Sequence, residues 1–157
     1  MAEMPPQGRA FTPRAYTSRL HESHECTDDS GRTVKKAVVV FAHGARDPAW
    51  AKPVEALAER LRGRMPDAHV TCAYLERMEP ELHAMLDRLA DEGYEEIVLL
   101  PVFWAAQGHV DGTLPKAASA LRERGITVRV LPVLSEIPGL LDFVSTKTND
   151  LLSPGTL

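Results

Sequence analysis

Two histidines follow strand-like apolar runs, and this position makes them the first candidates for chemistry. His43 comes directly after the run 37–42, and His109 follows the run 97–103 farther along the chain. Ligands of open α/β sheets bind outside the carboxyl ends of the strands. Because imidazole binds divalent ions and exchanges protons near neutral pH, the pair predicts metal handling or proton transfer. The alternative for His43 is a hydrogen bond to a loop carbonyl.

Two charged side chains are expected at the same edge of the sheet. Glu76 follows the second apolar run, and a carboxylate there could steer a metal, accept a proton or orient a histidine. Arg46 lies three residues after His43, where its guanidinium could bind a ligand carboxylate. Each has a simpler alternative, since Glu76 could pair with Arg77 and Arg46 with Asp47.

The connection that carries His109 is the longest between expected elements, from about Val102 to Gly112. Long ordered loops in compact domains are often functional. Phe103 and Trp104 could form an apolar wall beside the imidazole, or they could cap the core and leave His109 in solvent. In the first loop, Gly44 would allow a tight turn or the close approach of a ligand.

Alternating patterns predict the elements that position these residues. Apolar runs rich in β-branched residues predict strands at 37–42, 69–75, 96–103 and 127–131. Segments with the i, i+3, i+4, i+7 spacing of amphipathic helices follow each of them, over 54–61, 82–89, 114–121 and 140–151. This alternation predicts an α/β fold in which helices cover both faces of a four-stranded parallel sheet.

Residues 1–35 are predicted to be a disordered tail, and residues 36–157 a single α/β domain. The first segment is rich in polar residues and proline and shows no apolar periodicity, so it cannot bury enough surface to offset the cost of ordering. His21, His24 and Cys26 lie in this tail, either as incidental residues or as a segment for metal delivery or partner binding.

Composition narrows the class of protein. The length of 157 residues suffices for one domain with a core, and the net charge of −4 argues against nucleic-acid binding. No apolar run is long enough to span a bilayer or to act as a secretory signal, so no membrane partner is expected. Two cysteines without metal-type pairing make a reducing cytoplasm the simpler setting.

Other motifs and histidines carry less information. The chain has no G-x-G-x-x-G, no P-loop and no G-x-S-x-G motif. These absences argue against a nucleotide-binding protein and against a serine hydrolase. His69 opens an expected strand and His83 lies on an expected helix. Both are therefore expected on the surface, away from the carboxyl edge.

Three segments together resemble the small cobaltochelatases of the CbiX/SirB type. They are His43–Pro48 after its strand, Tyr74–Glu76 with Glu79–Pro80, and Leu100–Phe103 with Gly108–Val110. The likeness covers about Ala37 to Leu152 in matching order and spacing. The family usually has serine where this chain has Ala45, so this chain lacks a hydroxyl at that position.

The resemblance implies a chelatase fold, related to the flavodoxin-like sheet, and insertion of a divalent metal into sirohydrochlorin, a tetrapyrrole. The family's active-site histidines map onto His43 and His109, which are then metal ligands and catalytic residues, and its acid maps onto Glu76. The resemblance also implies that a short chain pairs as a homodimer around a shared cleft. Substrate contacts are expected from Arg46, Gly44, Phe103 and Gly108, with Trp104, Val102 and Lys116 nearby.

The metal is a substrate in this hypothesis, and no organic cofactor is expected. Co²⁺ is the first choice, and Fe²⁺ and Ni²⁺ remain alternatives because imidazole accepts all three. A site with two or three protein ligands would hold the ion loosely and keep positions open for transfer. The alternative to an enzyme is a non-catalytic protein with the same fold that binds the metal or the tetrapyrrole without turnover.

Overall fold

A parallel sheet of four strands forms the middle layer of the protein. The fold is given by a computed structural model, which describes residues 25–27, 31–105 and 109–153. The parallel strands lie in the order β3-β2-β4-β5. They are β2 (Thr33–Ala42), β3 (His69–Tyr74), β4 (Glu96–Pro101) and β5 (Thr127–Val130), and a short strand β1 (Glu25–Thr27) pairs antiparallel with the start of β2.

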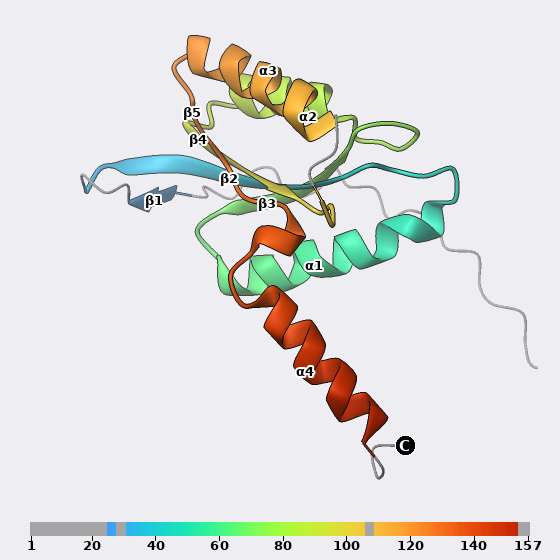
Figure 1. The fold of residues 1–157 in the computed structure, drawn as a ribbon. Coiled ribbons are helices and arrows are strands. Elements are labelled where there is room, and N and C mark those ends of the chain that lie inside the picture. Colours follow the sequence, from blue (N-terminus) through green and yellow to red (C-terminus); the bar gives the residue numbers. More distant parts are fainter. Residues whose placement is uncertain (1–24, 28–30, 106–108, 154–157) are drawn as a thin grey trace, which may run out of the picture.

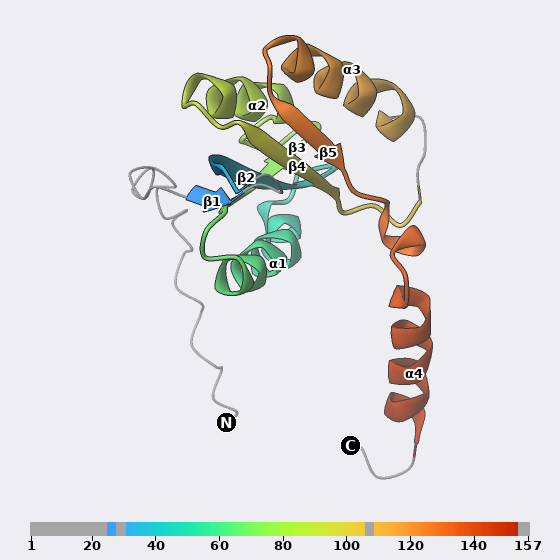
Figure 2. The same ribbon diagram turned by 90° about the vertical axis from the view of Figure 1, so that its left-hand side faces the viewer.

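Helices lie on both faces of the sheet, and a further helix extends away from it (Figure 1). They are α1 (Ala51–Arg64), α2 (Leu82–Asp91), α3 (His109–Glu123) and α4 (Leu140–Leu152), with short 3₁₀ turns η1 (Pro48–Trp50) and η2 (Leu134–Glu136). Helix α1 lies on one face and α2 and α3 lie side by side on the other (Figures 1 and 2). No helix in the described ranges combines the length and apolar character needed to cross a membrane.

The central strand β2 explains the layers, because its side chains alternate between the two faces. Val39 and Phe41 are buried in the cluster with α2 and α3, whereas Val38 and Val40 are buried in the cluster with α1. A strand buried on both faces reads as a continuous apolar run, which is why 37–42 was recognisable in the sequence.

The register brings three strand ends to one edge of the sheet. Ala42 of β2 lies opposite Tyr74 of β3, and Phe41 lies opposite Pro101 of β4. The residues that follow these strands therefore leave the sheet close together. The predicted α/β class, the parallel order and the carboxyl edge as a meeting point are confirmed.

Strand pairing begins inside the segment 1–35, and the division into a tail and a domain stays a prediction. Residues 25–27 form β1, and β2 already begins at Thr33, so strand pairing reaches into the segment predicted to be disordered. The short run Glu25–Thr27 has no apolar periodicity of its own and forms a strand because it pairs with β2. Residues 1–24, including His21 and His24, lie outside the described residues.

Helix α4 is formed as predicted but does not cover the sheet. It has no buried residue, and both views show it running away from the strands (Figures 1 and 2). Its exposed apolar side chains are Leu141, Phe143, Val144, Leu151 and Leu152. The expectation that four helices cover the sheet is therefore correct for three of them.

Candidate active site

The loops after β2 and β3 are joined by backbone hydrogen bonds beyond the strand ends. The amide of Leu75 donates to the carbonyl of Ala42 at 3.0 Å, and the amide of Glu76 donates to the carbonyl of His43 at 3.0 Å. These bonds fix His43 beside Glu76. Gly44 follows with φ of 91°, and a Cβ at that position would overlap the carbonyl oxygen of Glu76.

His43 and Glu76 are brought together as the sequence predicted. His43 Nε2 lies 3.4 Å from Glu76 Oε1, and Arg77 Nε lies 3.2 Å from the same oxygen. Both proposed partners of Glu76 are therefore present at once. The His43 and Glu76 side chains are 51% and 46% exposed, so water screens the attraction, and the pair orients the groups more than it stabilises the fold.

An open hollow of about 200 Å³ lies in front of this pair. Its lining residues are His43, Leu75, Glu76, His83 and Thr113. The expectation that His83 lies away from the carboxyl edge was wrong. The first turn of a helix that follows a parallel strand starts at that edge, and α2 begins soon after β3. The amide of Tyr74 donates to the carbonyl of Pro80 at 2.9 Å, which holds the start of α2 against the strand end.

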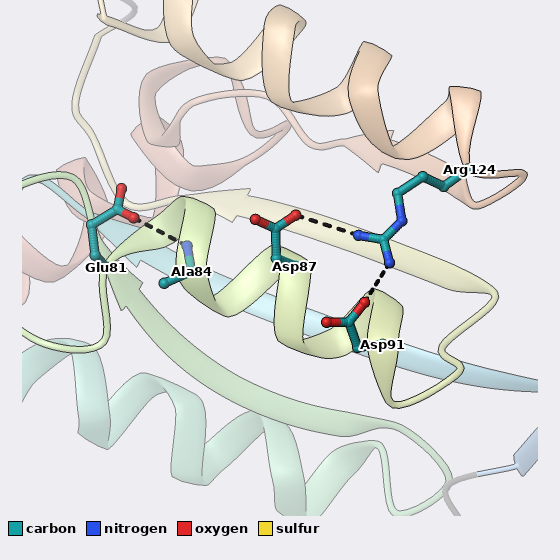
Figure 3. Close-up of polar contacts among 5 residues, drawn as sticks. All are labelled: Glu81, Ala84, Asp87, Asp91 and Arg124. Carbon is teal, nitrogen blue, oxygen red and sulfur yellow. Dashed lines mark hydrogen bonds and ion pairs between the residues drawn. The ribbon is translucent and has the colours of Figure 1, made fainter.

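Glu81 holds the His83 ring and caps the helix at the same time. Its Oε1 lies 2.9 Å from His83 Nδ1. Its Oε2 accepts a hydrogen bond from the amide of Ala84 at 3.1 Å, which Figure 3 shows. Burial raises the pKa of the Glu81 carboxyl, but the hydrogen bonds from His83 and Ala84 outweigh burial and leave this pKa below its ordinary value. The Glu81 carboxylate fixes the imidazole ring through Nδ1, and Nε2 is the ring nitrogen that Glu81 does not contact.

A second contact ties α2 to α3. Arg124 lies 2.6 Å from Asp91 and 3.4 Å from Asp87, both on α2 (Figure 3). His83 and Thr113 belong to the early turns of these two helices and line the same hollow. The ion pairs of Arg124 involve later turns of α2 and the residue after α3, so they join the two helices away from the hollow.

The third predicted segment is placed only in part. Helix α3 begins at His109, so the connection is shorter than the predicted Val102–Gly112. Gly108 lies outside the described residues and the His109 side chain is not described, so their roles remain predictions. Phe103 packs edge-on against Phe41, with ring centroids 5.2 Å apart, which agrees with the alternative that it caps the core. Its predicted contact with a substrate stays a prediction.

The remaining predicted contacts lie outside the hollow. Arg46 is exposed and does not line it. The Asp47 side chain accepts a hydrogen bond from the Ala49 amide at 2.9 Å and caps η1. Trp104 is 58% exposed, and Lys116 is exposed on α3. A role for these side chains in binding a carboxylated ring remains a prediction.

Two described side chains at the hollow, His43 and Glu76, could bind a divalent ion. Within the described ranges, no three His, Cys, Asp or Glu side chains meet closely enough to hold a metal. His43 and Glu76 supply two donors, one imidazole and one carboxylate. Two donors can take up a divalent ion and still release it, whereas a closed four-ligand cage is typical of a structural site.

Comparisons with known proteins agree with this geometry. The CbiX family model matches residues 37–151. A sirohydrochlorin cobaltochelatase of Methanopyrus kandleri is 32% identical over 80 residues, which cover 51% of this chain and 56% of that protein. The matched region thus spans little more than half the length of this curated relative.

Two solved structures share the fold. A CbiX protein from Marinobacter aquaeolei VT8 matches with a TM-score of 0.59 at 29% identity, over 74% of this chain and 97% of that one. The CbiX described as the terminal enzyme of siroheme biosynthesis in denitrifying bacteria matches with a TM-score of 0.57 at 25% identity, over 76% and 49%. Since the family model covers well over half of the sequence and includes all three predicted site segments, the chain belongs to the CbiX family.

Proposed function

We propose that this protein is a chelatase that inserts a divalent metal ion into sirohydrochlorin. The observation that carries the proposal is the pair His43 Nε2 and Glu76 Oε1, 3.4 Å apart at the rim of an open hollow. An imidazole and a carboxylate at the carboxyl edge can present an ion to a ring without enclosing it. The names of the relatives supply the tetrapyrrole.

The order of preference among metals follows the same relatives. Co²⁺ is proposed first because the curated relative is a cobaltochelatase. Fe²⁺ is the second candidate because one structural relative acts in siroheme biosynthesis, and Ni²⁺ is the third. Imidazole binds all three ions, so the described donors favour none of them by chemistry alone.

The active form is proposed to be a homodimer. The hollow of about 200 Å³ is smaller than the roughly 300–1,000 Å³ typical of small-molecule sites. A flat macrocycle has two faces, and a second copy related by a two-fold axis could cover the other face. The exposed apolar side chains of α4 support association because a helix with one apolar stripe normally buries it.

The direct test is metal insertion followed by absorbance. The full chain is incubated with sirohydrochlorin and Co²⁺, Fe²⁺ or Ni²⁺ in separate anaerobic reactions, each with a protein-free control. We expect acceleration with at least one ion, and the fastest ion identifies the metal. Rates equal to the control for all three ions, together with tight binding of sirohydrochlorin, would favour the non-catalytic binding protein instead.

Light scattering on the same samples tests the dimer. We expect the mass of two chains at concentrations where insertion is observed. A monomer with full activity would remove the homodimer from the proposal and leave the chelatase reaction in place.

A further inference from the structure

We propose that His83 is the base that accepts a pyrrole proton during metal insertion, separate from the groups that hold the ion. This inference rests on the proposed chelatase function and extends it to a residue outside the three motifs that resemble the family. It starts from the composition of the hollow, where His83 lies with His43 and Glu76.

The need for a separate base follows from counting electron pairs. Insertion of a divalent ion breaks two pyrrole N–H bonds, and each N–H electron pair stays on its nitrogen and binds the metal. Each proton must form a new bond to a base. An imidazole nitrogen whose lone pair holds the metal cannot accept a proton with the same pair. If His43 presents the ion, another group must take the protons.

The surroundings of His83 suit this role. Its Nδ1 is held by the Glu81 carboxylate at 2.9 Å, so Nδ1 carries the ring proton and Nε2 carries the basic lone pair. The other oxygen of Glu81 accepts from the Ala84 amide, so the carboxylate is itself fixed at the helix start. The His83 side chain is 55% exposed, so Nε2 can pass the first proton to water and then accept the second.

The other titratable groups at the hollow are less suited. Glu76 Oε1 is shared by His43 and Arg77, which leaves this oxygen engaged on two sides. His83 does not join His43 and Glu76 in a three-residue metal cluster within the described part of the chain. The geometry therefore assigns His83 to proton transfer and not to a third ligand position.

The test compares His83→Ala with His69→Gln in the full chain. His69 lies at the opposite end of β3, so its substitution removes an imidazole without touching the hollow. For H83A we expect kcat of insertion to fall at least about tenfold, which is less than the roughly hundredfold or more typical of general-base catalysis, because water can partly substitute for the base. The KM for sirohydrochlorin should change by less than about twofold, since a base acts in the transition state.

Free imidazole supplies a readout that a structural role would not produce. Because the ring is largely exposed, its removal leaves a space open to added imidazole, which should restore part of the lost kcat in H83A and leave H69Q unchanged. Melting curves that coincide with the wild type show that H83A is folded.

The outcomes separate the two proposals. A wild type no faster than the protein-free control refutes the chelatase function and this role with it. An active wild type with an equally active H83A refutes only the role of His83. A slow H83A that imidazole does not rescue, with a raised KM for the metal, makes His83 a ligand and also refutes its role as the base.

Discussion

The two ends of the sheet use similar residue types in different ways. At the amino end, Lys36 pairs with Glu96 at 3.0 Å, and Lys35 lies 4.4 Å from the centroid of the Tyr94 ring. His69 also lies beside Tyr94, with ring centroids 5.5 Å apart. At the carboxyl end, His43 faces an open hollow. The difference teaches that a histidine next to a strand becomes a candidate for chemistry only where its neighbours leave room for a ligand.

The largest contrast is expected in activity. His43→Ala should lower kcat/KM for metal insertion by about a hundredfold or more, equivalent to about 3 kcal/mol of transition-state stabilisation. The melting temperature should move little because the ring is half-exposed. His69→Gln, at the other end, should stay within about twofold of the wild type. Equal losses in both variants would show that the two ends do not differ in function.

The next contrast concerns two glycines with similar backbones. Gly44 at the carboxyl end and Gly93 at the amino end have φ of 91° and 81°, but only Gly44 has a close neighbour, the carbonyl of Glu76. Gly93→Ala should cost about 1 kcal/mol of unfolding free energy, the strain of the left-handed region alone. Gly44→Ala should cost at least about 1 kcal/mol more, because the loops must also separate.

Urea unfolding of both variants measures this difference. The activity of Gly44→Ala should fall with its stability, since the displaced loops carry His43 and Glu76. Equal unfolding free energies for the two variants would mean that the loops after β2 and β3 can separate without loss of stability. Their contact would then not be a rigid support for the site.

The interior of β3 gives a smaller and pH-dependent effect. Cys72 is buried, and burial raises the pKa of its thiol to about 11. The folded state therefore holds the proton above the unfolded pKa of 9.0, so this contribution to stability is complete below pH 9 and is lost as the pH rises toward 11. At pH 8, only about one Cys72 thiol in a thousand is ionised.

A thiol reagent should label the partly exposed Cys26 first and Cys72 only after unfolding. Labelling of both at one rate in the native protein would contradict a closed interior.

The sequence predicted the strands and helices, and it predicted the loop residues His43 and Glu76 of the hollow. It did not predict that His83 of α2 lines the same hollow. Apolar periodicity located the strands, and the strand ends located His43 and Glu76, because register follows from parallel pairing. His83 was missed because its place depends on where α2 begins relative to β3. The signal was available in the short segment Glu79–Glu81, which leaves no room for the helix to start anywhere but the carboxyl edge.

Two other features were beyond sequence periodicity for a physical reason. The spacing of α4 predicts a helix, but a stripe of apolar side chains does not say which surface will cover it, and none in the described chain does. The strand β1 has three residues and exists through its ladder with β2. Long-range partners of this kind are set by the whole fold and not by the local pattern.

The smallest contrast is the coupling between charges at the two ends. The Lys36 and Glu96 side chains are 21% and 17% exposed, whereas those of Arg77 and Glu76 are 50% and 46% exposed. Water screens the second pair more, so a double-mutant cycle with Lys36→Met and Glu96→Gln should give a coupling of about 1 kcal/mol, and one with Arg77→Met and Glu76→Gln less than about 0.5 kcal/mol. The cycles are measured by urea unfolding, and raising the salt concentration should reduce the weaker coupling first. A larger coupling at the carboxyl end would show that Glu76 mainly stabilises the fold. Its contact with His43 would then no longer support a role in metal insertion.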